Sequence, residues 1–296
     1  MNILITGASG FIGHALTEHL RTQGHEVFTL GRRPTQTPHH FHWQPRAGKI
    51  ELDTEIAFDA VINLAGENIA SRWTASKKDE ILMSRVSATQ LLCDTLSKLP
   101  NPPKVLINGS AMGYYGDTKD AVVEETSAPG TGFLAQVAKN WEEAAKPAVD
   151  AGIRTVYLRT GLVTHPDGGA LQQMLLPFKL GLGGRLGDGL HYMSWISLRD
   201  AVSSIAFILA HPTISGPVNM VSPQPVTNSE FTEALGKALH RPTIFPMPAP
   251  IARLIFGEMA DEALLASIRV YPQVLLKAGF EFQHPELSSY LVECLR

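Results

Sequence analysis

The hydrophobic pattern along the chain switches repeatedly between two periods. Short apolar runs rich in β-branched residues, typical of buried strands, alternate with longer stretches that have helical spacing. This alternation predicts βαβ units and a parallel sheet. The expected strands are 2–6, 26–30, 60–64, 104–108 and 154–158, and the expected helices are 11–23, about 84–98 and about 135–151.

The regular pattern ends after Arg159. Glycine-rich turns follow at 181–189, and a proline-rich stretch covers 242–250. A capping box, Thr227 with Glu230, introduces a further helix in this part of the chain. The sequence therefore predicts a regular α/β part followed by a less regular second lobe.

Composition and charge exclude several classes of protein. The chain has 296 residues, of which 44% are hydrophobic and 18% charged, the balance of an ordinary globular protein. The net charge is −3 and no basic run occurs, so we expect no nucleic-acid partner. No apolar run approaches the ~20 residues that span a bilayer, so we expect no membrane-spanning segment.

Cysteines and the first residues bear on the compartment. Cys93 and Cys294 are far apart, which gives neither a disulfide framework nor a metal-binding pair. Residues 1–6 have the pattern of a buried strand and not of a secretory signal. We therefore expect a cytoplasmic protein.

The first predicted strand runs directly into a glycine-rich turn that precedes a predicted helix. Gly7, Gly10 and Gly13 allow, in order, a tight turn, close approach of a pyrophosphate and close packing of helix on strand. Backbone N–H groups of Phe11 and Ile12, at the positive end of the helix dipole, would then bind the phosphates. A turn without a ligand is the alternative, but the strand and helix on either side favour a dinucleotide site.

The residues after the second predicted strand indicate which dinucleotide binds. An NAD-specific site usually has an acidic residue there, about 20 residues beyond the glycines. This chain has Gly31-Arg32-Arg33 instead. Because a guanidinium pairs with a 2′-phosphate and an acid repels it, the sequence predicts NADP, with Arg32 as the main contact. Two solvated arginines in a loop remain the alternative.

Several motifs together carry a family resemblance. The glycine spacing, Asn63-Leu64-Ala65-Gly66, and Ser110 leading into Tyr115-Gly116 resemble the extended short-chain dehydrogenase/reductases. Longer segments resemble the bacterial branch called epimerase family proteins, and the resemblance covers essentially the whole chain. These segments are 63–69, 113–116, 141–142, 175–184, 194–196 and 216–219.

The resemblance implies a fold and a division of the chain. The fold is α/β, a Rossmann-type doubly wound parallel sheet with a smaller C-terminal lobe on the substrate side. The NADP-binding domain would be 1–163, completed by 195–221, and 164–296 would mainly form the cap and a small C-terminal domain. The resemblance also implies cofactor contacts from the turn after the 60–64 strand, the helix that follows it, and a later strand. These residues are Leu64, Ala65, Gly66, Glu80, Arg85 and Val163.

Glu80 and Arg85 have a simpler alternative role. Arg85 occupies a position where extended members place an asparagine, so the resemblance suggests a cationic group near the cofactor. The two side chains could instead form an exposed ion pair of little energetic weight.

The usual catalytic pair of this superfamily is missing. The ordinary mechanism needs a serine to hold the substrate oxygen, a tyrosine to transfer the proton, and a lysine one helical turn later that favours the phenolate. Ser110 fills the first position. Alignment of the next helix on Glu142 puts Leu134 and Ala138 in the other two, and a shift by one residue gives 133 and 137, again without the pair.

The remaining candidates for proton transfer are nearby phenols. Tyr114 is the candidate that we place beside Ser110 in a catalytic role, and Tyr115 is expected to be a structural aromatic residue. Lys139 lies one position past the lysine slot, a rotation of about 100° around the helix. Histidines at 39, 40 and 42 lack ligands at a matching spacing, so we expect no metal site.

Two functions remain open at this point. The first is an NADP-dependent oxidoreductase or sugar-nucleotide-epimerase-like enzyme that acts on a small molecule. The second is a non-catalytic NADP-binding regulator or redox sensor, which the missing tyrosine and lysine favour. The fold alone does not decide between them. The sequence specifies neither the substrate nor the oligomeric state, and it leaves open whether Trp195 and Tyr192 line the cleft or the core.

Overall fold

The computed structural model describes residues 1–35 and 37–296, and an eight-stranded sheet forms its centre. All neighbouring strands are parallel except the last pair, β3 and β4. The order β12-β8-β6-β5-β1-β2-β3-β4 places the first strand in the interior, between β5 and β2. The strands are β1 (Asn2–Thr6), β2 (Glu26–Gly31), β3 (His40–Gln44), β4 (Lys49–Ile50), β5 (Ala60–Asn63), β6 (Val105–Ala111), β8 (Arg154–Thr160) and β12 (Gly216–Met220).

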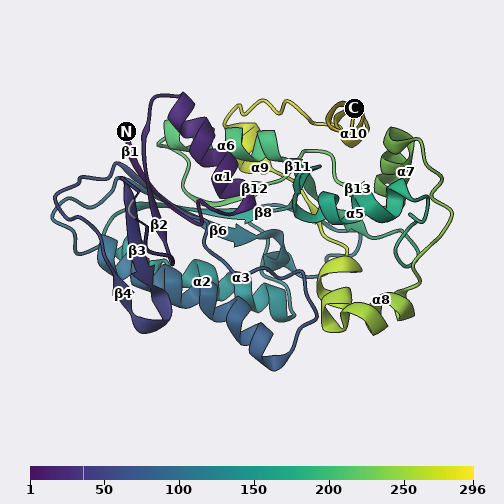
Figure 1. Cartoon of the computed structure of the whole chain (residues 1–296), viewed down its shortest axis with the longest axis horizontal. Helices are drawn as coiled ribbons and strands as arrows, with labels where there is room; N and C mark the ends of the chain where they lie inside the picture. The colour runs from purple at the N-terminus through teal and green to yellow at the C-terminus, as the bar shows by residue number, and fades with distance from the viewer. Residues whose placement is uncertain (36) are drawn as a thin grey trace.

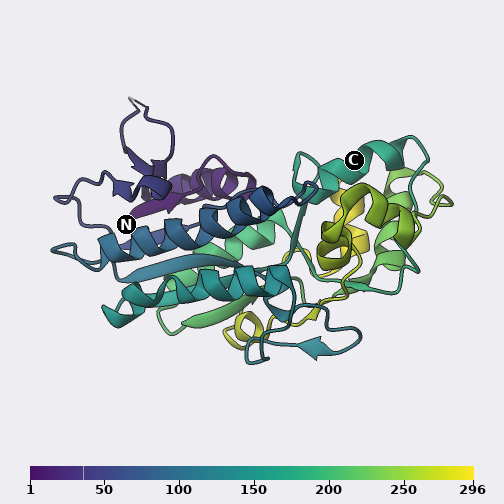
Figure 2. The ribbon, with the colours of Figure 1, turned by 90° about the horizontal axis from the view of Figure 1, so that it is seen from below.

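Helices cover both faces of this sheet (Figures 1 and 2). Alternate residues of β1 point to opposite faces: Ile3 and Ile5 join the core under α1 and α6, and Leu4 joins the core under α2 and α4. The parallel sheet that the periodicity predicts is confirmed, and the chain folds as the Rossmann-type doubly wound α/β sheet that the family resemblance implies. The helices of this part are α1 (Phe11–Thr22), α2 (Ala75–Leu96), α3 (Phe133–Glu143), α4 (Lys146–Asp150) and α6 (Leu198–Ala210), with 3-10 turns at Pro45–Ala47 and Met112–Tyr115.

A second lobe lies beside the sheet and has its own apolar core, which includes Leu171, Trp195, Phe231 and Leu291 (Figure 2). Its helices are α5 (Gly169–Lys179), α7 (Asn228–Leu239), α8 (Ala249–Phe256) and α10 (Leu287–Cys294), with a π-helical turn at Ala260–Leu264. The short helix α9 (Gln273–Lys277) packs instead against β12, and its Leu275 belongs to the core of the large sheet. Three pairs of short strands accompany them: β7 (Val122–Val123) with β14 (Arg269–Val270), β9 (Leu162–His165) with β11 (Trp195–Ser197), and β10 (Tyr192–Met193) with β13 (Val226–Thr227).

Two expected helices have different bounds in the structure. The helix expected from about residue 84 begins at Ala75, because Thr74 caps it by accepting from the Lys77 N–H at 3.1 Å. The helix expected over about 135–151 is two helices, α3 and α4. Pro147 explains the break, since it has no N–H to continue the ladder of α3 and is instead accommodated in the first turn of α4.

The structure also shows where Trp195 lies and whether the predicted capping box forms. Trp195 belongs to the core: its side chain is fully buried, it stacks on Tyr290, and its indole N–H donates to the Gln224 carbonyl at 3.0 Å. The capping box of Thr227 and Glu230 is confirmed at the start of α7.

Candidate cofactor and active site

The turn between β1 and α1 requires glycine at two positions. Gly7 has a φ of +70°, and a Cβ there would lie 2.6 Å from the Leu64 carbonyl oxygen. A Cβ at Gly13 would lie 2.2 Å from the Gly7 carbonyl oxygen. Side chains at these positions would therefore push the turn away from β5 or push α1 away from the turn.

Gly10 is different, because its backbone conformation does not require glycine. It is the N-cap of α1, is exposed, and has an ordinary extended backbone with a φ of −79°. A Cβ there would approach the Gly7 carbonyl oxygen to 3.1 Å, a tight contact but a much milder one than those at Gly7 and Gly13. No side chain of the described residues caps α1, so the N–H groups of Phe11 and Ile12 have no side-chain acceptor. We call the backbone of Gly10, Phe11 and Ile12 at this helix start the cradle. This cradle fits a pyrophosphate.

The turn after β5 is hydrogen-bonded to Thr6, at the end of β1. Thr6 donates from Oγ1 to Asn63 Oδ1 at 2.6 Å and accepts from the Ala65 N–H at 3.2 Å. The Leu64 N–H donates to the Thr6 carbonyl at 3.2 Å. Leu64 and Ala65 therefore lie against Gly7, at the carboxyl edge of the sheet where ligands bind in this architecture.

Two other predicted contacts flank the loop. Gly31 ends β2, where a Cβ would lie 2.7 Å from the His40 ring, and Arg32 follows it as an exposed side chain. Val163 is buried in β9, and the turn after β9 lies on Phe11, because a Cβ at Gly168 would come within 2.3 Å of the Phe11 ring. Residues from four parts of the sequence thus lie beside the loop after β1 or at the ends of the neighbouring strands.

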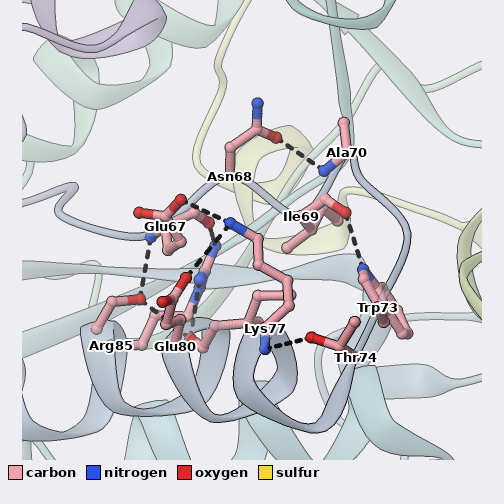
Figure 3. A network of polar contacts seen from close by, with 11 residues as sticks. Glu67, Asn68, Ile69, Ala70, Trp73, Thr74, Lys77, Glu80 and Arg85 are labelled. Carbon is pink, nitrogen blue, oxygen red and sulfur yellow. Dashed lines mark hydrogen bonds and ion pairs between the residues drawn. The ribbon is translucent and has the colours of Figure 1, made fainter.

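Arg85 supports the Gly66–Glu67 turn. Its guanidinium donates to the Ile81 and Glu67 carbonyls, each at 3.0 Å (Figure 3). The guanidinium also lies over the Trp141 ring, 5.0 Å from its centroid. Burial lowers the pKa of Arg85 to about 10. A contact between Arg85 and cofactor stays a prediction, and the contacts in the structure are those of a residue that holds the turn.

Glu80 and Arg85 do not form the ion pair that was the alternative for them. Glu80 lies 3.8 Å from the ammonium of Lys77, which also donates to Glu67 at 2.7 Å (Figure 3). Arg85 instead points at backbone carbonyls. Glu67 and Lys77 were not singled out from the sequence, because nothing in their spacing indicates that they meet.

Ser110 is the start of a buried polar network. Its side chain lies at the end of β6, the residue is 4% exposed, and its hydroxyl donates to Glu142 of α3 at 2.7 Å. Glu142 in turn accepts two bonds from Arg159 of β8, at 2.9 and 3.0 Å. Since the Ser110 O–H donates to this carboxylate, Ser110 can offer only its lone pairs to a ligand. Sequence reasoning used Glu142 only to align the helix and missed Arg159.

The two tyrosines meet the same guanidinium in different ways. The Arg159 guanidinium carbon lies 3.5 Å from the centroid of the Tyr114 ring, and its Nη1 donates to the Tyr115 hydroxyl at 3.0 Å. Tyr115 donates to Asn219 at 2.7 Å, and burial raises its pKa to about 12. Tyr115 is thus held as a neutral buried phenol. Tyr114 is only partly buried and is the more exposed of the two tyrosines.

Positions 134 and 138, where the usual catalytic tyrosine and lysine are expected, lie on α3. Ala138 is buried, and the Leu134 N–H donates to Glu262 of the second lobe at 3.1 Å. The Lys139 side chain is 50% exposed and lies 3.9 Å from Glu143 on the next turn of its own helix. Lys139 therefore points to solvent. Within the described ranges, no group of three or more potential ligand side chains is arranged to hold a metal ion, and no helix is long and apolar enough to cross a membrane.

Comparison with known proteins finds relatives along the whole chain. Residues 3–220 match the model of the "NAD dependent epimerase/dehydratase family", and residues 247–294 match a domain of unknown function, DUF1731. Epimerase family protein Mb2239 of Mycobacterium bovis is 46% identical over 290 residues, which cover 98% of this chain and 96% of that protein.

Two solved structures are similar over the full length of the chain. Human epimerase family protein SDR39U1, solved with NADPH, has a TM-score of 0.92 and 35% identity, covering 100% of this chain and 99% of that one. A nucleoside-diphosphate sugar epimerase from Corynebacterium glutamicum has a TM-score of 0.81 and 32% identity, covering 100% of this chain and 58% of that one. The chain therefore belongs to the NAD dependent epimerase/dehydratase family.

Proposed function

We propose that this protein binds NADP at the loop after β1 and uses it in an oxidoreductase or epimerase-like reaction on a small molecule. The observation that carries the proposal is the open cradle at Gly10, where the uncapped N-terminus of α1 faces the carboxyl edge of the sheet. Arg32 in place of an acidic residue supports NADP over NAD. The human relative that was solved with NADPH supports the same cofactor.

The proposed chemistry is assigned to Tyr114 and Ser110. A bound nicotinamide supplies hydride transfer, so the protein must orient the substrate and move one proton. Because its own O–H donates to Glu142, Ser110 can only accept a hydrogen bond, so it orients the substrate through an O–H or N–H group beside the reacting carbon. Tyr114, whose ring rests on Arg159, donates its phenolic proton to the oxygen of the reacting carbonyl and regains a proton from solvent.

Variants in an activity assay test this assignment. Small ketones, aldehydes and nucleotide sugars are screened for NADPH oxidation or epimerisation. Because a general acid contributes about 10²–10⁴ in rate, Ser110→Ala and Tyr114→Phe should each lower turnover at least tenfold with NADPH affinity nearly unchanged. Lys139→Ala, on the same helix as the missing pair but facing solvent, is the control. Loss of activity in Lys139→Ala alone would show that the assignment is wrong.

A second candidate function is a non-catalytic NADP-dependent regulator. Two observations favour it. The Ser110 hydroxyl donates its hydrogen bond to Glu142 and so cannot donate to a substrate oxygen, and positions 134 and 138 carry neither tyrosine nor lysine. The regulator should bind NADPH and change the protection of its amide protons in the second lobe without any turnover. Turnover that disappears in Tyr114→Phe would exclude this candidate.

A further inference from the structure

The turn that follows β5 carries a carboxylate surrounded by cations. Glu67 is fixed through its backbone, since its N–H donates to Ser84 Oγ at 3.0 Å and its carbonyl accepts from Arg85 at 3.0 Å (Figure 3). Its carboxylate accepts from the Lys77 ammonium at 2.7 Å. The hydrogen bond from Lys77, followed by the charges of Lys77, Arg32 and Arg85, holds the pKa of Glu67 below its ordinary value.

The strand order of the sheet places Arg32 and Glu67 at the same edge. Arg32 follows β2 and Glu67 lies just beyond β5, and both strands flank β1, so the two residues stand on either side of the phosphate loop. Neighbouring strands are about 4.8 Å apart, so the ends of β2 and β5 are about 10 Å apart, a gap that two long side chains can close. Lys77 reaches the same place from the first turn of α2. The adenosine end of the proposed cofactor lies at this edge.

We propose that Lys77 is a second cation of the 2′-phosphate site, and that its ammonium transfers from Glu67 to the phosphate when NADP binds. Glu67 is then the internal anion that holds Lys77 in place in the free protein. The inference rests on the proposed function, because it assumes that the 2′-phosphate approaches Arg32.

The contacts of Lys77 permit this exchange. The side chains of Lys77 and Glu67 are 20% and 30% exposed, so neither charge is sealed in the interior. An ion pair with this exposure contributes only about 0–1 kcal/mol, whereas a phosphate monoester near pH 7 carries a charge of about −1.5 to −2. The flexible stem of a lysine allows its head group to move without a change in backbone. A dianionic phosphate beside Arg32 therefore competes with Glu67 for the Lys77 ammonium.

The test compares ligands with and without the 2′-phosphate. Dissociation constants are measured for NADPH, NADH, adenosine 2′,5′-bisphosphate and adenosine 5′-monophosphate with wild type, Lys77→Met and Lys77→Arg. Lys78→Met is the matched control, since Lys78 is the adjacent lysine on α2 and pairs with Glu258 at 2.7 Å. Thermal melts establish that each variant is folded.

The expected result is selective. Lys77→Met should weaken NADPH and the bisphosphate about tenfold, which corresponds to about 1.4 kcal/mol, and change NADH and the monophosphate less than about twofold. Lys77→Arg should restore most of the affinity, and Lys78→Met should resemble wild type. Equal weakening of all four ligands, or of none, overturns the inference. If wild type itself fails to prefer NADPH over NADH, the proposed cofactor is wrong and the inference falls with it.

Discussion

Substitution of Gly10 by valine separates cofactor binding from folding. Gly10 has a φ of −79°, which valine adopts without strain, and it is exposed at the start of α1. The new Cβ would meet only the Gly7 carbonyl oxygen, at 3.1 Å. The rest of the side chain would stand in the cradle in front of Phe11 and Ile12. We therefore expect Gly10→Val to abolish most NADP binding in a protein that still folds.

The magnitudes follow from these contacts. Charge-assisted hydrogen bonds contribute about 1.5–3 kcal/mol each, so losing the two from Phe11 and Ile12 to a pyrophosphate should weaken binding by about 3–6 kcal/mol, or about 10²–10⁴-fold. The effect on folding is smaller. Valine is a poorer N-cap than glycine, which costs about 1 kcal/mol, and in a chain of this size lowers Tm by about 2–4 °C or less.

The assay pairs calorimetric titration of NADPH with a thermal melt, and Gly13→Ala is the matched control. A Cβ at Gly13 would lie 2.2 Å from the Gly7 carbonyl oxygen, so this variant should lose about 1–3 kcal/mol of stability through overpacking. If Gly10→Val melts far below wild type while its folded fraction binds NADPH normally, the cradle is structural and the binding site has been misplaced.

Three further predictions concern other parts of the site. Arg32→Ala should weaken NADPH by about 1.5–3 kcal/mol and leave NADH unchanged, as measured by calorimetry; equal affinity of wild type for both would refute it. Arg159→Leu should lower the free energy of unfolding in urea by about 3–5 kcal/mol, because it leaves Glu142 buried and unpaired; a loss under about 1 kcal/mol would contradict the buried network. Burial raises the pKa of Glu125, so the folded state holds this proton more tightly than the unfolded chain does, and stability falls as pH rises through the raised pKa. Glu125→Gln should therefore be more stable than wild type at neutral pH but not below pH 4; parallel urea stabilities across this range would refute it.

Features encoded by short-range pattern could be predicted from the sequence. The strand at Asn2–Thr6 has the predicted bounds, and α1 differs by one residue at its end, because hydrophobic period and glycine spacing are local. The glycines at 7, 10 and 13 also predicted the tight turn between β1 and α1. The difference between these glycines required the structure, since it lies in the contacts that a Cβ would make at each position.

Features that depend on long-range contacts could not be predicted. Ser110 was singled out, but its partner Glu142 and the Arg159 that fixes Glu142 lie on α3 and β8, and no spacing rule connects them. The same holds for Lys77 and Glu67, which meet because a turn folds back over α2. Whether two such side chains meet depends on the direction in which packing holds each of them.

The central claim is that NADP lies in the cradle with its nicotinamide within reach of Tyr114, and a crystal structure of the NADPH complex tests it most directly. The account predicts pyrophosphate oxygens on the N–H groups of Phe11 and Ile12. It also predicts the Tyr114 hydroxyl about 2.6–3.2 Å from the water or substrate oxygen above nicotinamide C4. A cofactor bound elsewhere, or a nicotinamide separated from Tyr114 by other side chains, would contradict it.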